Sequence, residues 1–128
     1  MEVSELMFGN WVLYDGKSYQ YYAPYLDIED EISNVVLIID KNKNKYLCGI
    51  KYIAPIPLTG EILEANGFTR SKVFVEWKYE DDNIYMLWKP FPWIKIEMED
   101  HTVMFPCEYV HELQNALLLC GIDKEIIL

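Results

Sequence analysis

Hydrophobic and polar residues alternate along the first part of the chain, which is the pattern of half-buried β-strands. The stretches NWVLY (10–14) and SYQYY (18–22) flank Asp15-Gly16. Asp-Gly between two alternating stretches favours a tight hairpin turn, because both positions of such a turn need a positive φ angle. The pattern therefore predicts a β-hairpin near the start of the sequence.

A second hairpin is predicted around KNKNK (41–45), which is expected to be a solvated turn. The apolar run VVLII (35–39) before it is typical of a strand covered on both faces. The stretch YLCGIKY (46–52) after it alternates at period two. One face of that strand would carry Tyr46, Cys48, Ile50 and Tyr52.

Prolines in APIPL (54–58) interrupt the alternation, since proline cannot donate to a strand ladder. A short helix is predicted next, with Thr59 as its N-cap and Gly67 just beyond its end, although Gly60 weakens its first turn. Alternation then resumes in four stretches joined by short polar or proline-containing turns, which predicts a β-meander. The four expected strands cover 72–79, 84–89, 94–99 and 102–105.

A longer helix is expected over residues 107–119, ended by Gly121. At about 100° per residue its apolar side chains gather in one arc, so the helix should pack on a sheet face. That arc consists of Tyr109, Val110, Leu113, Leu117 and Cys120.

These elements place the chain in the α+β class, mostly antiparallel β, with about eight strands, one short helix and one packed C-terminal helix. Residues 1–54 have the pattern of an SH3-like barrel half, and residues 55–128 carry the short helix, the meander and the last helix. The chain has 128 residues, of which 52% are hydrophobic, so residues 1–128 are expected to form a single domain with a substantial core.

The composition also limits the kinds of partner that the protein is expected to bind. The formal net charge is −10, from 21 acidic and 11 basic residues, and both halves of the chain are acidic. Phosphate backbones are bound by clustered lysine and arginine, and Arg70 is the only arginine in the sequence. This balance disfavours nucleic acid as a partner.

The cysteines Cys48, Cys107 and Cys120 have no CxxC spacing, which indicates free thiols in a reducing compartment. The start MEVSELMFG lacks the basic segment and apolar run of a signal peptide, and the longest apolar run is too short to cross a membrane. Nucleotide and hydrolase motifs such as GxGxxG and GxSxG do not occur. We therefore expect a cytoplasmic protein without a cofactor and without membrane association.

The stretch YVHELQN (109–115) resembles the start of the H-E-x-x-H motif of zinc proteases. In that motif two histidines one helical turn apart converge on a metal, whereas here the second position is Asn115, a poor zinc ligand. On helical spacing His111, Glu112 and Asn115 fall opposite the apolar arc, so they are expected to face solvent or a partner. The pattern predicts no metal site and no catalytic group.

Three other features have a chemical and a plainer interpretation. His101 follows Glu99-Asp100 and could pair with a carboxylate for acid–base work, but an exposed turn is the favoured interpretation. The acidic run DIEDE (27–31) lacks the glycine and the spaced ligands of a calcium-binding loop. An enzyme of unrecognised type would need a deep pocket with perturbed carboxylates, for which the candidates are Glu76, Glu97 and Glu99.

The strongest candidate for a contact surface is YQYYAPY (19–25). At period two Tyr19 and Tyr21 share one face of a strand and Tyr22 takes the other, so the four tyrosines cannot all point inward. Exposed tyrosines beside a proline are typical of protein and peptide contacts, while the alternative is that the rest of the domain covers both faces. The candidate partner contacts are Tyr19, Tyr21, Tyr22, Tyr25, His111 and Asn115.

Three stretches, FGNWVLYDGK, PIPLTGEILEANGF and YVHELQNALLLCGI, resemble in this order a family of small proteins from gut bacteria and their phages or prophages. That family usually has glutamate at the position of Gly60 and glutamine at that of Glu112, so Glu112 is no fixed catalytic group. No activity, cofactor or catalytic residue is assigned to the family. The resemblance implies a cytoplasmic protein of a bacterium or phage, encoded on a mobile element.

Three hypotheses follow, in order of preference. The first is a non-enzymatic interaction module that binds an unknown protein partner, with a homodimer as the alternative; EIIL (125–128) would then either pack back onto the sheet or meet a second subunit. The second is a nucleic-acid-binding SH3-like or OB-like barrel whose aromatic residues stack on bases. The third is an enzyme of unrecognised type.

Overall fold

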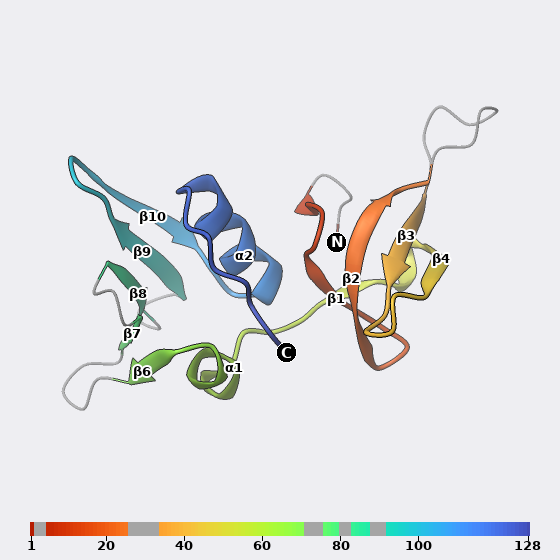
Figure 1. Ribbon diagram of the computed structural model, residues 1–128, viewed down its shortest axis with the longest axis horizontal. Coiled ribbons are helices and arrows are strands. Elements are labelled where there is room, and N and C mark those ends of the chain that lie inside the picture. Colours follow the sequence, from red (N-terminus) through yellow and green to blue (C-terminus); the bar gives the residue numbers. More distant parts are fainter. Residues whose placement is uncertain (2–4, 26–33, 71–75, 80–82, 88–91) are drawn as a thin grey trace. The chain divides into compact units, whose positions relative to one another are not determined.

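The computed structural model describes residues 1, 5–25, 34–70, 76–79, 83–87 and 92–128, except for the side chain of Glu76. The chain divides into two compact units, unit 1 (Met1–Ile56) and unit 2 (Pro57–Leu128), close to the division expected between residues 54 and 55. Each unit has its own antiparallel sheet, and the α+β, mostly β class is confirmed (Figure 1). The expectation that residues 1–128 form a single domain stays a prediction.

Unit 1 is a five-stranded sheet in the order β4-β3-β2-β1-β5. Neighbouring strands are antiparallel, and a short 3-10 helix, Ile50–Tyr52, precedes the last strand. Because β4 and β5 are the two edges, the described strands do not close into a barrel, and the SH3-like barrel is not confirmed. The strands are β1 (Trp11–Tyr14), β2 (Lys17–Pro24), β3 (Val35–Ile39), β4 (Lys45–Gly49) and β5 (Ala54–Pro55).

Both predicted hairpins are confirmed. Asp15 and Gly16, with φ angles of 50° and 74°, connect β1 to β2 in the turn that Asp-Gly favours. Strands β3 and β4 pair around the lysine-rich turn. However, β4 ends at Gly49, where the 3-10 helix begins, so the predicted face of four residues holds only as far as Cys48, and Tyr52 is 62% exposed.

The core of unit 1 lies on one face of its sheet. It consists of Leu6, Val12, Tyr21, Val36, Ile38, Cys48 and Ile53. Within VVLII the alternate residues Val36 and Ile38 are fully buried, and the other three are half-buried. The second face of β3 is therefore only partly covered within the described residues.

Unit 2 contains a five-stranded meander in the order β10-β9-β8-β7-β6 and two helices. The meander is confirmed, and the sequence missed its short first strand β6, as it missed β5 in unit 1. Parts of the expected strands at 72–75 and 88–89, with Val73, Val75 and Trp88, lie outside the described residues. The elements are α1 (Gly60–Ala65), β6 (Phe68–Arg70), β7 (Glu76–Tyr79), β8 (Ile84–Leu87), β9 (Trp93–Glu97), β10 (Thr102–Pro106) and α2 (Val110–Leu119).

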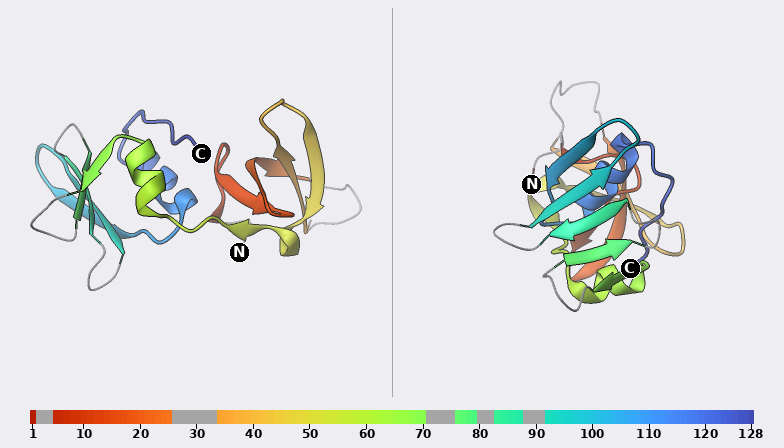
Figure 2. Two further views of the ribbon diagram at one scale, coloured as in Figure 1. Left: turned by 90° about the horizontal axis from the view of Figure 1, so that it is seen from below. Right: turned by 90° about the vertical axis from the view of Figure 1, so that its left-hand side faces the viewer.

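The meander alternates as predicted, and α2 lies along one face of its sheet (Figures 1 and 2). On β8 and β9 every second residue is buried: Ile84, Met86, Ile94 and Ile96. Helix α2 buries Val110, Leu113 and Leu117 of its predicted arc. The expectation of a packed C-terminal helix is thus confirmed, with a start at Val110 rather than Cys107.

The short helix α1 is capped as predicted, because the Thr59 hydroxyl accepts a hydrogen bond from the Ile62 N–H at 3.2 Å. Gly67, with a φ angle of +91°, follows the helix. Gly60 has a second role that the sequence did not suggest: a Cβ atom there would lie 2.9 Å from Cζ2 of Trp77. The missing side chain lets the indole ring approach the first turn.

The end of the chain packs back onto unit 2, which decides between the two alternatives for EIIL. Ile126 is only 1% exposed. The Asn66 side chain accepts a hydrogen bond from the Ile127 N–H at 2.7 Å and donates one to the Ile127 carbonyl at 2.8 Å. The same amide nitrogen also donates to the Ile62 carbonyl at 2.8 Å, which ties the C-terminal segment to α1.

Candidate functional site

The four tyrosines of YQYYAPY have different environments. Tyr21 is 5% exposed and pairs with Ile38 inside the core of unit 1, where burial raises the pKa of its hydroxyl. Tyr21 is therefore a core residue and not a contact candidate. Tyr22 and Tyr25 are 37% and 48% exposed, so these two remain candidates.

Tyr22 lies on the opposite strand face from Tyr21, as alternation predicts, and β2 is irregular at this residue. The pairing with β3 shifts between Tyr21 and Ala23, which leaves Tyr22 as the extra residue of a β-bulge. The Lys45 ammonium lies 4.8 Å from the centre of the Tyr22 ring, and Phe8 contacts the ring edge-on at 5.4 Å. The expected division of Tyr19 and Tyr21 from Tyr22 by strand face agrees with these contacts.

Tyr19 belongs to a row of three tyrosine rings on the core side of the sheet. Its ring meets Tyr14 at 5.9 Å and Tyr46 at 5.7 Å, in both cases edge to face. Beside this row opens a cleft of about 390 Å³ between the two hairpins. The cleft, called the tyrosine cleft below, is lined by Lys17, Ser18, Tyr19, Asp40, Lys41, Asn42 and Tyr46.

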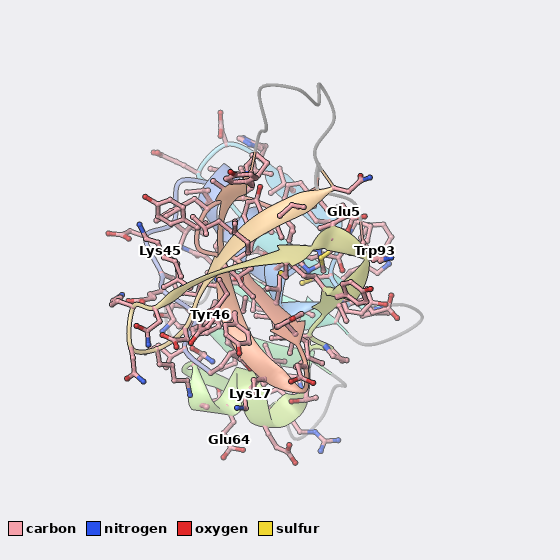
Figure 3. The ribbon with its side chains drawn as sticks, turned by 90° about the vertical axis from the view of Figure 1, so that its right-hand side faces the viewer. Glu5, Lys17, Lys45, Tyr46, Glu64 and Trp93 are labelled. Carbon is pink, nitrogen blue, oxygen red and sulfur yellow. The ribbon has the colours of Figure 1, made fainter. Side chains whose placement is uncertain are left out.

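Register explains why these residues meet. Strand β2 pairs with β1 on one side and with β3 on the other, so the β1–β2 turn and the β3–β4 turn lie at the same end of the sheet. Lys17 starts β2 and Tyr46 belongs to β4, and Figure 3 labels both at this end of unit 1. Tyr46 is 43% exposed, which leaves part of its ring accessible from the cleft.

Asp40 holds the β3–β4 turn, whose residues line one side of the cleft. Its carboxylate accepts hydrogen bonds from the Asn42 and Asn44 N–H groups at 2.9 Å, from the Asn44 amide at 3.3 Å and from the Tyr46 hydroxyl at 3.1 Å. Partial burial raises the pKa of Asp40, but these four hydrogen bonds outweigh it and hold the pKa below its ordinary value. The Asp40 carboxylate therefore stabilises the β3–β4 turn.

Sequence reasoning missed Lys17 and Tyr46 as site residues. The sequence pattern predicts a solvated turn for KNKNK and a strand face for Tyr46, but it does not relate either of them to Tyr19. The signal that could have found them is the register itself: two tight hairpins that share β2 must bring both turns to one end of the sheet.

Of the two helix candidates, His111 is corrected, and Asn115 stays a prediction. His111 is only 2% exposed, so the expectation that it faces solvent or a partner is wrong. Its ring stacks on Tyr109 at 5.9 Å with an angle of 14° between the planes. Asn115 is half-buried. A helical wheel gives only the direction of each side chain around the helix axis and not what covers the first turn. Here the Tyr109 ring covers His111.

Glu112 has a structural role at the start of α2. Its carboxylate accepts hydrogen bonds from the Glu108 and Tyr109 N–H groups at 3.0 and 3.1 Å. A carboxylate at this position also interacts favourably with the positive end of the helix dipole. Glutamine can accept the same bonds, so the role does not require a charge.

A second cleft, of about 340 Å³, opens in unit 2 beside this helix start, and it is lined by Pro92, Trp93, Pro106, Cys107, Glu108 and Glu112. Its thiol is unsuited to nucleophilic chemistry: burial and then the charge of Glu112 raise the pKa of Cys107 far above its ordinary value. Burial also raises the pKa values of Cys48 and Cys120. The raised pKa disfavours the thiolate form at all three cysteines.

The remaining chemical candidates are exposed, apart from Glu76, whose side chain lies outside the described residues. His101 lies in a turn, with its Nδ1 atom 2.6 Å from Asp100, and both side chains are largely in solvent. Glu97 lies 3.6 Å from Lys95 on the strand surface, and Glu99 is exposed. Within the described part of the chain no group of three metal-binding side chains occurs, and DIEDE (27–31) lies outside it.

No helix among the described residues is both long enough and apolar enough to cross a membrane. No family model matches the chain, and neither a curated protein nor a solved structure matches it significantly.

Proposed function

We propose that this protein is a non-enzymatic protein-interaction module and that its contact surface is the tyrosine cleft of unit 1. The observation that carries the proposal is the row Tyr14–Tyr19–Tyr46, whose rings support one another edge to face along an open cleft. Aromatic rings fixed in this way offer contact area at a small loss of conformational freedom, which is why tyrosine is enriched in binding surfaces.

The wider setting of the proposal is a cytoplasmic protein of a bacterium or phage. For unit 1 we further propose an SH3-like barrel. The strand order β4-β3-β2-β1-β5 and the 3-10 helix between β4 and β5 support this, because an SH3-like barrel has the same order and the same short turn.

Selection from a random peptide library, with the full-length protein as bait, tests the function directly. We expect the wild-type protein to enrich a set of related peptides, and Tyr46→Ala to lose their binding, because the substitution removes one wall of the cleft. The matched control is Tyr52→Ala, which removes a 62% exposed tyrosine of the same unit that does not line the cleft.

Two results would contradict the proposal. One is the absence of any enriched peptide, and the other is equal binding of the enriched peptides to wild type and to Tyr46→Ala. In both cases a spectrum of each variant must first show that the variant keeps the wild-type fold. If Tyr46→Ala does not fold, Lys17→Gln combined with Lys41→Gln changes the cleft without removing a ring.

A further inference from the structure

The charged residues that line the tyrosine cleft are two lysines and one aspartate, Lys17, Lys41 and Asp40, whereas the chain as a whole is acidic. The chain has a formal net charge of −10. Residues 1–56 are acidic as well, with eight acidic residues and five lysines, so the contrast is confined to the residues that line the cleft. The lysines are Lys17, Lys41, Lys43, Lys45 and Lys51. All but Lys51 lie at the two hairpin turns beside the cleft or at the start of the strand that follows.

Among the described residues that line the cleft, Asp40 is the only carboxylate, and its hydrogen-bonding capacity is used within the protein. Both oxygens of Asp40 accept hydrogen bonds from the turn and from Tyr46. Lys17 and Lys41, in contrast, have no ion-pair partner among the residues that the structure describes. The cleft therefore offers two ammonium groups, the Ser18 hydroxyl and the Asn42 amide, most of which are donors.

The aromatic rings near the cleft are poorly placed to stack on nucleobases. The three rings of the row already pack edge to face on one another, and the Tyr22 ring carries the Lys45 ammonium. Single-stranded nucleic acid is held by free aromatic faces together with an extended positive groove. The rings of Tyr19 and Tyr46 therefore offer contact area for apolar atoms more than free faces for stacking, and the polar groups beside them are mostly hydrogen-bond donors.

We infer that the tyrosine cleft takes an acidic segment of a partner protein, whose carboxylates meet Lys17 and Lys41 while its apolar atoms contact Tyr19 and Tyr46. The inference deepens the proposed function and rests on it. Lysine binds carboxylates as a point charge, so the cleft would select for acidic composition more than for one fixed geometry.

The test compares three probes on the full-length protein. They are the peptide most enriched by library selection, the same peptide with each Asp changed to Asn and each Glu to Gln, and an oligothymidylate of similar length. We expect Asp and Glu to be over-represented in the selected peptides and the neutral analogue to bind roughly tenfold more weakly, as expected for the loss of two exposed ion pairs. The oligothymidylate should bind more weakly than the peptide.

A matched pair of double variants locates the charges that matter. Lys17→Gln with Lys41→Gln should weaken the selected peptide about as much as neutralising the peptide does. Lys51→Gln with Lys124→Gln removes the same charge elsewhere and should leave affinity near the wild-type value. Equal losses in the two double variants would overturn the inference, because they would show a general charge effect.

Failure of the inference is distinguishable from failure of the proposed function. Selected peptides that depend on Tyr46 but contain no excess of acidic residues overturn the inference and leave the interaction module standing. Tighter binding of the oligothymidylate than of any peptide overturns both and favours the nucleic-acid-binding alternative.

Discussion

At the scale of single residues, adjacent positions on one strand have opposite roles. Tyr21 and Tyr22 are neighbours in β2, yet one is 5% exposed and the other 37%. Alternation along the strand accounts for this difference, because it places Tyr21 on the core face opposite Ile38 and Tyr22 on the other face, where its ring meets Lys45.

Substitution of these two tyrosines should therefore separate folding from surface effects. We predict that Tyr21→Ala lowers the free energy of unfolding by about 3 kcal/mol, since it leaves a cavity in the core of unit 1. Tyr22→Ala should cost less than about 1 kcal/mol, because it removes only partly exposed ring contacts. Urea unfolding measures both values, and a larger loss for Tyr22→Ala would contradict the assignment of Tyr21 to the core.

A second residue-scale prediction concerns α2. His111 is 2% exposed, whereas Leu118 on the same helix is 59% exposed. We predict that His111→Ala lowers the free energy of unfolding by about 2 kcal/mol through lost packing on Tyr109, while Leu118→Ala changes it by less than about 0.5 kcal/mol. Similar small effects for both substitutions would show that His111 faces solvent after all.

The sequence identified the surface tyrosines as a class but not their individual roles. Period-two alternation correctly assigns Tyr19 and Tyr21 to one face, but it does not say which face carries the core. It also does not reveal the close neighbours of Tyr46, because those depend on the register of two hairpins. His111 was misplaced because a helical wheel ignores what covers the end of a helix.

At the scale of elements, the β3–β4 turn is held by one ionised side chain. The four hydrogen bonds to Asp40 hold its pKa below the ordinary value, in opposition to partial burial. The turn's stability from this carboxylate is present above the ordinary pKa of aspartate and is lost as the pH falls through the lowered pKa of the folded state. Acid should therefore loosen this end of the cleft.

Tyr46 gives the direct test of this coupling. We predict that Tyr46→Phe raises the pKa of Asp40 towards its ordinary value, because one of the four hydrogen bonds is removed. Carboxyl-detected NMR titration of Asp40 in both proteins measures the change. In the wild type, the hydrogen bond to Asp40 and then the charge of Asp40 raise the pKa of Tyr46. An unchanged Asp40 pKa in Tyr46→Phe would contradict the coupling.

The C-terminal segment offers a matched pair of neighbours. Ile126 is 1% exposed and Ile127 is 64% exposed. We predict that Ile126→Ala lowers the free energy of unfolding by about 2–4 kcal/mol, whereas Ile127→Ala changes it by less than about 0.5 kcal/mol, since Asn66 holds the backbone of Ile127 and not its side chain. Thermal and urea unfolding of both variants checks this, and equal effects would contradict the packed chain end.

Most elements follow from local signals in the sequence. The Asp-Gly turn, the capped helix after Thr59 and the strands β8 to β10 were all predicted, because turn residues and period-two alternation determine them locally. The short strands β5 and β6 were not, since a two- or three-residue strand is formed by its partner's backbone and leaves no periodic pattern of its own.

At the scale of the whole molecule, the net charge of −10 conceals a difference between local surfaces. A strongly acidic average keeps a protein soluble and disfavours phosphate backbones. It does not describe the turn end of unit 1, where register gathers Lys17 and Lys41 around the tyrosine row. Hydrophobic patterning alone does not show this cluster, because its lysines belong to two hairpins whose turns meet only through the strand register.

The most direct test of the central claim is NMR mapping of a library-selected peptide on the isotope-labelled full-length protein. The account predicts that the largest shifts of backbone amides occur at residues 17–19, 40–42 and 46, which line the tyrosine cleft. Shifts concentrated in unit 2, or around Phe8 and Tyr25 without change in the cleft, would contradict the claim that the tyrosine cleft is the contact surface.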